Sequence, residues 1–179
     1  TVGLNRNMQN LCPNAHFVNL KADGMPVGWL RSVTGSSTIV RDTAQLRGSP
    51  YSLKLTCVGD GRAFAETFFT TNNFGARLPL NPIPAGRLRG RTLTVGAWCW
   101  SATPGFGAIK FNNGSTNYGY VNHSGSGQWE FLAITERTED LGNEFSIQLR
   151  SDTNNASTTG ECWFSEPIVV FGTDVPQSY

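Results

Sequence analysis

The sequence predicts an all-β protein built as an antiparallel sandwich of two sheets. Short runs of alternating apolar and polar residues recur along the chain, and 20 glycines and 9 prolines separate them. We find no convincing stretch with the 3.6-residue period of an amphipathic helix. Hydrophobic residues make up 39% of the 179 residues, which is enough for one folded core. We assign residues 1–14 to an N-terminal arm and residues 15–179 to a single domain.

Strand-length runs bounded by turn residues extend along the whole domain. In residues 51–57 every second residue is apolar, as in a strand with one buried face. The Gly59–Gly61 turn is expected to join this strand to the next as a hairpin. The long segment 71–90 is expected to cross between the sheets or to carry function. The predicted strands are 15–20, 28–33, 37–41, 51–57, 63–70, 91–100, 106–111, 117–121, 128–136, 144–150 and 161–171.

The alternation also predicts which strand faces meet the core. In residues 91–100, Trp98 and Trp100 lie opposite the apolar set, and Trp163 lies opposite Phe164 in the last strand. The two tryptophans therefore face a ligand, another subunit or an outer loop. The apolar set opposite them is Leu93, Val95, Ala97 and Cys99.

The four cysteines are expected to be structural. Cys57 and Cys99 extend apolar faces, and we expect both to be buried free thiols. A zinc site is disfavoured because no two cysteines have C-x-x-C spacing. One or two disulfides are the alternative if the protein works outside the cell.

Five short motifs resemble, in the same order, those of jelly-roll carbohydrate-binding modules of the family 4/9 type. Residues 10–17 (NLCPNAHF) resemble their opening N-L-x-P-N-x-x-F, and residues 48–55 (GSPYSLKL) resemble their strand G-x-Y-S-L-K-L. The resemblance implies an all-β, two-sheet antiparallel jelly-roll β-sandwich. The remaining motifs are residues 24–29 (GMPVGW), 90–98 (GRTLTVGAW) and 127–129 (GQW).

The resemblance implies two further features. Trp29 and Trp129 fall where these modules use tryptophan to cap the ends of the core. Related modules often hold a calcium ion with acids after the opening motif and in the last strand, but most of those acids are missing here. Asn19, Asp23 and Glu166 could remain as ligands, so we expect no metal site, no other cofactor and little effect of a chelator on the melting temperature.

Aromatic residues are the main binding candidates. A sugar ring stacks its apolar C–H face on a flat aromatic surface, so Trp98 and Trp100 form a candidate glycan platform. Tyr118 and Tyr120 repeat the same spacing and are expected to extend it. The alternative is that these rings pack within the fold or against another subunit.

Arginines of the long segment are a second candidate contact. Arg87 and Arg89 alternate after a proline-rich stretch and could pair with acids of another subunit. A solvated edge is the alternative reading of the same run.

A catalytic apparatus is hard to assemble from this sequence. The two histidines, His16 and His123, lie in no recognisable nucleophile motif. Acidic pairs such as Glu136 with Glu139 or Asp140 are interpreted as solvated turn residues rather than as the facing carboxylates of a glycosidase. We expect a protein that is not an enzyme.

The function expected from these observations is that of a non-catalytic virion protein of a bacteriophage: a capsid decoration, head-fibre or tail module that could contact cell-surface glycans. Its partners would be other virion subunits or copies of itself, and its location the virion, assembled in the host cytoplasm. The alternative is an extracellular glycan-binding module of a secreted polysaccharide-degrading enzyme. A formal net charge of +1 disfavours nucleic acid and anionic lipid as partners, and no apolar run is long enough for a membrane span.

Overall fold

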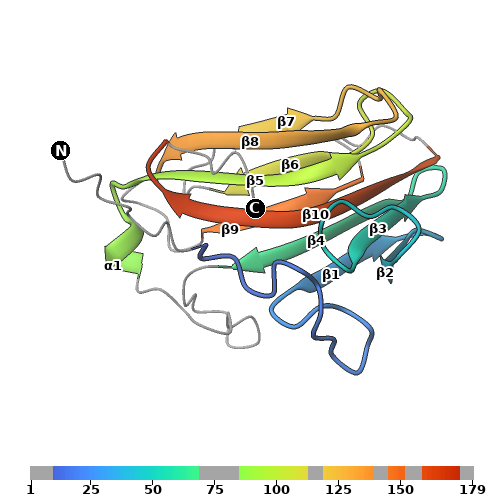
Figure 1. Cartoon of the computed structure of the whole chain (residues 1–179), viewed down its shortest axis with the longest axis horizontal. Helices are drawn as coiled ribbons and strands as arrows, with labels where there is room; N and C mark the ends of the chain where they lie inside the picture. The colour runs from blue at the N-terminus through green and yellow to red at the C-terminus, as the bar shows by residue number, and fades with distance from the viewer. Residues whose placement is uncertain (1–9, 69–84, 113–118, 139–144, 152–158, 174–179) are drawn as a thin grey trace.

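The computed structural model describes residues 10–68, 85–112, 119–138, 145–151 and 159–173, which fold as two antiparallel five-stranded sheets (Figure 1). The predicted all-β sandwich is confirmed. The first sheet has the order β1-β4-β9-β6-β7 and contains β1 (Leu30–Thr34), β4 (Arg62–Phe68), β9 (Ser146–Arg150), β6 (Ala108–Asn112) and β7 (Gly119–Asn122). The second has the order β2-β3-β10-β5-β8 and contains β2 (Thr38–Asp42), β3 (Ser52–Cys57), β10 (Gly160–Phe171), β5 (Thr92–Trp100) and β8 (Trp129–Arg137).

The first strand predicted from the sequence is absent. Residues 13–16 form a turn, and residues 17–20 are irregular apart from one isolated bridge from Leu20 to Pro26. Asn14 and Phe17 have φ angles of 48° and 54°, and this left-handed conformation interrupts an extended strand. Phe17 is nevertheless fully buried, because the turn directs its ring toward the core. Each of the other predicted strands overlaps an observed one.

The hairpin predicted at Gly59–Gly61 is wrong. β3 and β4 lie in different sheets, so residues 58–61 carry the chain across the sandwich instead of pairing its two arms. The turn itself is present, with the Gly61 amide donating to the Val58 carbonyl at 3.0 Å. Strand alternation predicts which face of a strand is buried but not to which sheet the strand belongs. The sequence therefore could not distinguish a hairpin from a crossing between the two sheets.

The connection from β4 to β5 also passes from one sheet to the other, as predicted for a segment of this length. Its described part contains α1 (Ala85–Leu88), a four-residue helix, with Leu88 fully buried. Among the described residues no helix has the length and apolar character that crossing a bilayer requires.

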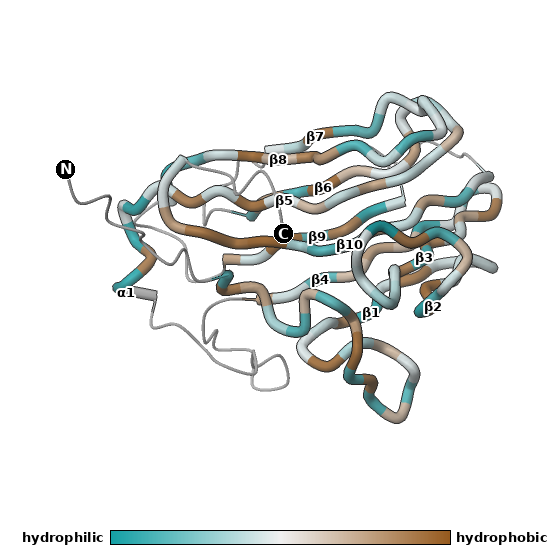
Figure 2. Tube along the Cα trace, in the orientation of Figure 1, coloured by the Kyte–Doolittle hydropathy of each residue, from teal (hydrophilic) through white to brown (hydrophobic). Residues whose placement is uncertain are grey.

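The core lies between the two sheets and follows the predicted alternation. Cys57 and Cys99 are fully buried, and all four cysteines are free thiols. Figure 2 shows hydrophobic and hydrophilic residues alternating along most strands, whereas the end of β10 is a continuous hydrophobic run, Ile168–Phe171. The core includes, from both sheets, Leu53, Leu55, Leu93, Val95, Ala97, Phe164, Ala63, Ala65, Ile109, Phe111, Ile147 and Leu149.

One end of the core is closed by the segment that precedes β1. Trp29 is fully buried, packs edge-on against Phe17 with ring centroids 5.8 Å apart, and donates its indole N–H to the Pro13 carbonyl at 3.1 Å. Its predicted capping position is confirmed. The described part of the expected arm is tied to β10, where Asn10 accepts from the amide of Val169 at 2.9 Å.

Candidate functional site

Each sheet has an outer face, and the two faces differ in chemistry. Residues paired across strands share a face, so the register fixes which side chains lie together. The sheet that contains β5 and β10 has an aromatic outer face, which we call the tryptophan face. Its members are Trp98, Trp100, Trp129, Phe131 and Trp163.

Three tryptophans of this face form a row across adjacent strands. Trp100 is paired with Trp129 on one side and with Trp163 on the other. The rings of Trp100 and Trp163 meet edge to face, with centroids 5.1 Å apart. Trp98 and Trp100 therefore lie outside the core, as the alternation predicts, and both are half-buried.

Trp129 does not cap the core, contrary to the expectation from the resemblance. Its pairing with Trp100 places it on the outer face, where it is half-buried. The polar–apolar alternation of β8 is weak. Glu130 and Glu136 are on the face of the sheet that meets the core, whereas Phe131 and Ala133 are on its outer face. The strand pattern alone therefore did not reveal its orientation.

The rings of the tryptophan face are largely engaged with one another and with charged groups. Trp98 packs against Phe131 with centroids 5.2 Å apart, and the guanidinium of Arg47 lies 3.4 Å from the Trp98 ring centre. Trp163 is buried and donates its indole N–H to Asp42 at 2.6 Å. Burial alone would raise the pKa of Asp42, but this bond and two backbone amides lower it below its usual value.

The other aromatic and basic candidates do not join the tryptophan face. Tyr120 lies on β7, in the opposite sheet, so it cannot extend the platform of Trp98 and Trp100. Tyr118 lies outside the described residues. Arg87 is in α1, Arg89 follows it, and both are exposed.

The outer face of the other sheet carries a polar row that crosses it from strand to strand. Glu66 on β4 pairs with Gln148 on β9, Gln148 with Lys110 on β6, and Lys110 with Tyr120 on β7. These four residues are called the polar row below. Exposure runs from 8% at Glu66 to 37% at Tyr120, so the row is recessed at one end and open at the other.

Hydrogen bonds fix the recessed end of the polar row. Oε1 of Glu66 accepts from the Ser146 hydroxyl at 2.7 Å and from Nε2 of Gln148 at 3.0 Å. Oε1 of Gln148 in turn accepts from Nη1 of Arg150 at 2.8 Å. The amide of Gln148 is therefore held in one orientation between an acid and a base, which preorganises this part of the face.

Two cation–aromatic pairs flank Gln148. The Arg150 guanidinium lies 5.0 Å from the Phe64 ring centre, and Nζ of Lys110 lies 5.5 Å from that of Tyr120. Phe64 and Arg150 are paired across β4 and β9, one row away from Glu66 and Gln148. The face thus combines apolar ring surface with polar groups in fixed positions.

Sequence reasoning missed this face. None of its residues except Tyr120 is among the candidates predicted from the sequence, although the signal was present. Polar or aromatic residues at alternate positions of Arg62–Phe68 and of Ser146–Arg150 show that both strands carry chemistry on one side. What was missing was the pairing of β4 with β9, which brings these side chains together.

The two histidines have structural partners. Nδ1 of His123 accepts from the Gly125 amide at 2.8 Å, so Nε2 carries the proton and donates to the Gln128 carbonyl at 2.9 Å. Glu130 lies 3.7 Å from the same ring nitrogen. His16 meets the buried Ser49 hydroxyl at 3.1 Å through Nδ1.

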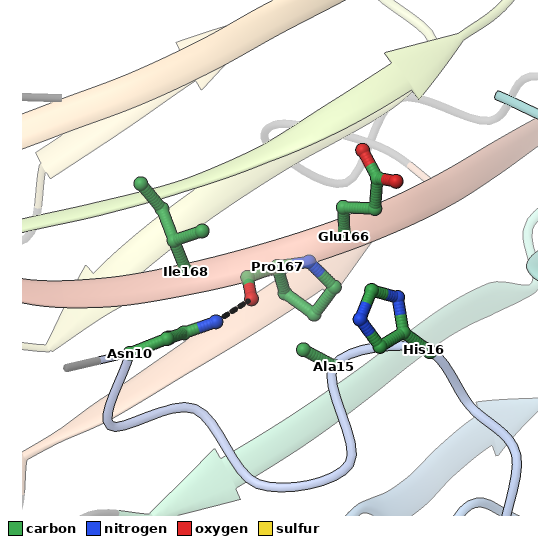
Figure 3. Close-up of a pocket in the computed structure, with 6 residues that line it drawn as sticks. All are labelled: Asn10, Ala15, His16, Glu166, Pro167 and Ile168. Carbon is green, nitrogen blue, oxygen red and sulfur yellow. Dashed lines mark hydrogen bonds between the residues drawn. The ribbon is translucent and has the colours of Figure 1, made fainter. Parts of the chain in front are cut away.

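A small depression lies between the first described residues and β10 (Figure 3). Asn10 spans it by donating to the Pro167 carbonyl at 3.0 Å, and Glu166 and His16 line it. Glu166 is paired with Arg47 at 2.8 Å, and Asp23 with Lys21 at 3.6 Å. Two of the three residual calcium candidates therefore already have cationic partners, while Asn19 is bonded through its backbone to Asn14.

No protein-family model matches this chain, and no curated protein matches it in sequence. Solved structures do match its fold. Tailspike protein 4 of bacteriophage CBA120, solved as its enzymatically active domain, superposes with a TM-score of 0.62 at 16% identity, covering 90% of this chain and 21% of that chain. TmCBM61, solved with β-1,4-galactotriose, gives a TM-score of 0.60 at 12% identity, covering 92% and 99%.

A family 11 carbohydrate-binding module of the cellulase Lic26A-Cel5E from Clostridium thermocellum gives a TM-score of 0.52 at 9% identity, covering 94% of this chain and 95% of that chain. The resemblance inferred from the sequence motifs is thus confirmed for the fold, which is that of jelly-roll carbohydrate-binding modules and of a phage tailspike domain.

Proposed function

We propose that this protein binds a glycan chain across the polar row. The observation that carries the proposal is the continuous register of Glu66, Gln148, Lys110 and Tyr120 over four adjacent strands of one outer face. Strands lie about 4.8 Å apart, so the row extends roughly 14 Å across the sheet. This is room for a short oligosaccharide running perpendicular to the strands.

The chemistry of the row suits sugars. Each sugar hydroxyl both donates and accepts, and the row offers amide, carboxylate and ammonium groups within one line. The ring of Tyr120 ends this line and the ring of Phe64 lies one row beside it, and both offer apolar surface for the C–H faces of sugar rings. The likeness in fold to TmCBM61, solved with a galactotriose, supports this reading.

The proposed role is binding without catalysis. Hydrolysis of a glycosidic bond ordinarily uses two carboxylates that flank it. Among the residues that the structure describes, Glu66 is the one carboxylate on this outer face, and it is committed to Ser146 and Gln148. TmCBM61 and the family 11 module, which this chain resembles in fold, are carbohydrate-binding modules.

We place this module in a bacteriophage virion, as part of its capsid decoration, head fibre or tail. The likeness to a phage tailspike domain supports this placement. The alternative is a binding module of a secreted polysaccharide-degrading enzyme, which the likeness to carbohydrate-binding modules supports equally.

The tryptophan face is the second candidate, as an attachment surface for another virion subunit or a second copy. Trp100 and Trp129 lie half-buried on it, and Val40 on the same strand row is 46% exposed. Apolar surface of this kind on an outer sheet face is typical of protein contacts.

A glycan array followed by titration calorimetry tests the proposal. Gln148→Ala should weaken binding about tenfold or more, because it removes a fixed amide from the centre of the row. Glu66→Gln should weaken it less, since the amide keeps part of the hydrogen bonding. Trp100→Ala, on the opposite face, is the matched control. Equal losses in Gln148→Ala and Trp100→Ala, or no bound glycan at all, would contradict the proposal.

A further inference from the structure

We propose that the polar row selects its glycan by one unsubstituted hydroxyl group, which Glu66 and Gln148 together bind as both a donor and an acceptor. This inference rests on the proposed function and adds a chemical requirement for the ligand. A sugar that carries a hydrogen atom, an O-methyl group or an O-acetyl group at that position binds more weakly, because it cannot form both hydrogen bonds.

The carboxylate of Glu66 has one oxygen engaged with the protein and one that is not. Oε1 accepts from the Ser146 hydroxyl at 2.7 Å and from Nε2 of Gln148 at 3.0 Å. A carboxylate oxygen accepts about two hydrogen bonds, so the capacity of Oε1 is filled. Oε2 forms no hydrogen bond or ion pair within the described part of the chain. Oε2 is therefore the acceptor that remains for a ligand.

The amide of Gln148 leaves one donor beside that acceptor. Its Oε1 accepts from Nη1 of Arg150 at 2.8 Å, and one of its two N–H groups donates to Glu66. A reversed amide would turn its oxygen toward the carboxylate and its NH2 group toward the guanidinium, so the orientation is fixed. The second N–H group has no acceptor among the described residues. A fixed donor thus lies next to a fixed acceptor.

A sugar hydroxyl is the group that satisfies both at once. Its proton points to Oε2 of Glu66 while its oxygen accepts from Nε2 of Gln148, so a single O–H group forms two hydrogen bonds. The bond to the charged carboxylate is the stronger of the two, and Glu66 therefore contributes most of the discrimination. An ether or ester oxygen at the same place accepts but cannot donate, and it faces Oε2 as a second acceptor. A deoxy sugar leaves both protein groups without a partner.

The depth of the Glu66–Gln148 pair favours a small group. Glu66 is 8% exposed and Ser146, which holds it, is fully buried, whereas Gln148 is half-buried. A ligand therefore reaches the pair from the Gln148 side, and a hydroxyl needs to contact only one oxygen and one N–H group. A methyl or acetyl substituent would have to fit into the same recess. Polar groups left without a partner there are costly, because water reaches them poorly.

Modified trisaccharides test whether one hydroxyl is selected. The whole protein is screened on a glycan array and titrated with galactotriose, cellotriose, mannotriose and xylotriose. The tightest-binding chain is then compared with its own monodeoxy, monofluoro and mono-O-methyl derivatives. We expect one position at which the deoxy and O-methyl derivatives each bind about tenfold or more weakly than the parent chain. The fluoro derivative at that position should also bind weakly, because fluorine donates no proton.

Glu66→Gln tests the carboxylate, because it keeps the size of the side chain and reverses one bonding role. Ser146 and Gln148 both donate to this side chain, so the new amide turns its oxygen toward them and its NH2 group toward the ligand. The pair then offers two donors, which suits an ether oxygen. We expect the parent chain to lose affinity about threefold, and the ratio of parent to O-methyl affinity to fall from about tenfold to about threefold or less. A merely structural role of Glu66 would lower both affinities alike and leave this ratio unchanged.

Glu161→Gln is the matched control. Glu161 lies on β10, on the opposite outer face, and pairs with Lys54 at 2.6 Å. The same chemical change there should alter neither the affinity nor the ratio. Urea unfolding checks that both variants retain the fold. If Glu66→Gln does not fold, the derivative series on the unaltered protein decides the question.

The outcomes separate this inference from the proposed function. Equal binding of the parent, deoxy and O-methyl chains, with a loss of affinity in Gln148→Ala, would overturn the hydroxyl requirement and leave glycan binding intact. A ratio that Glu66→Gln does not change would also overturn it, and so would an O-methyl derivative that binds as well as the parent chain. Absence of binding to any glycan would overturn both.

Discussion

The guanidinium of Arg47 lies 3.4 Å from the ring centre of Trp98, and its Nη1 donates to Oε2 of Glu166 at 2.8 Å. One side chain from the loop after β2 thus joins the tryptophan face to the bulge of β10. Glu166 has a φ of 51°, a left-handed conformation that a glutamate seldom adopts, at a point where the β5–β10 register shifts. The ion pair helps to hold this irregular residue in place.

Arg47→Met should therefore destabilise the protein by about 1–2 kcal/mol, because the nearly buried carboxylate of Glu166 loses its charged partner. Chemical denaturation followed by tryptophan fluorescence measures this, and the native emission should also change as the ring of Trp98 loses its cover. Arg41→Met is the control, because Arg41 also lies over a ring, that of Tyr51 at 3.9 Å, but forms no ion pair with a carboxylate among the described residues. Equal losses in both variants would show that the Glu166 pair is not what matters.

Trp100→Ala should leave the fold intact and weaken attachment to a second subunit or to the virion. Trp100 is half-buried on an outer face, whereas Trp29 is fully buried in the core. Trp29→Ala should consequently cost about 3–5 kcal/mol of stability, and Trp100→Ala clearly less. Denaturation curves and light scattering of the untagged protein provide the two measurements.

Three results of the Trp100→Ala experiment are informative. Loss of assembly with unchanged glycan binding supports attachment through the tryptophan face. Loss of glycan binding with unchanged assembly moves the glycan site to that face. An unfolded variant would show that the packing of Trp100 against Trp163 is needed for the fold, and would contradict the expectation that the fold stays intact.

Stability should fall in acid through Glu130. Hydrogen bonds from Ser124 and Ser126 lower the pKa of its carboxyl from 4.5 to about 2, against the opposing effect of burial. The pKa is lower in the folded state, so the contribution is complete above the unfolded value and disappears as pH falls from about 5 to 2. We expect about 1 kcal/mol, a modest value because the side chain is 27% exposed.

Urea unfolding at a series of pH values measures this contribution. Glu130→Gln should flatten the loss of stability below pH 5, and Ser126→Ala should reproduce part of that change by removing one donor. An unaltered pH profile in Glu130→Gln would show that these bonds do not favour the charged carboxyl.

Cys57 and Cys99 should react with a thiol reagent only after denaturation. Both are fully buried, and Cys57 also donates its S–H to the Gly61 carbonyl at 2.6 Å. Mass spectrometry after labelling of native and urea-unfolded protein distinguishes the two states. Rapid labelling of both thiols in the native protein would contradict their placement.

Much of the fold could be predicted because a strand has a period of two. The alternation in residues 91–100 predicted that Trp98 and Trp100 lie opposite Cys99, and the structure confirms this. Residues 15–20 have the apolar content of a strand but not its backbone, since Asn14 and Phe17 adopt left-handed φ angles. Local composition does not report such a turn, which is held by tertiary burial of the Phe17 ring.

The sequence by itself determined the class of fold, the strand faces and the burial of Trp29, because these follow from local periodicity and from motifs read along the chain. Only the tertiary structure decided which strands are neighbours, and with them the site. Glu66 and Gln148 are 82 positions apart and hydrogen-bonded, and Tyr120 proved to lie on the sheet opposite to Trp100. A period of two assigns each side chain to one face of its strand. Its neighbours on adjacent strands depend on the strand order of the two sheets, which the period does not contain.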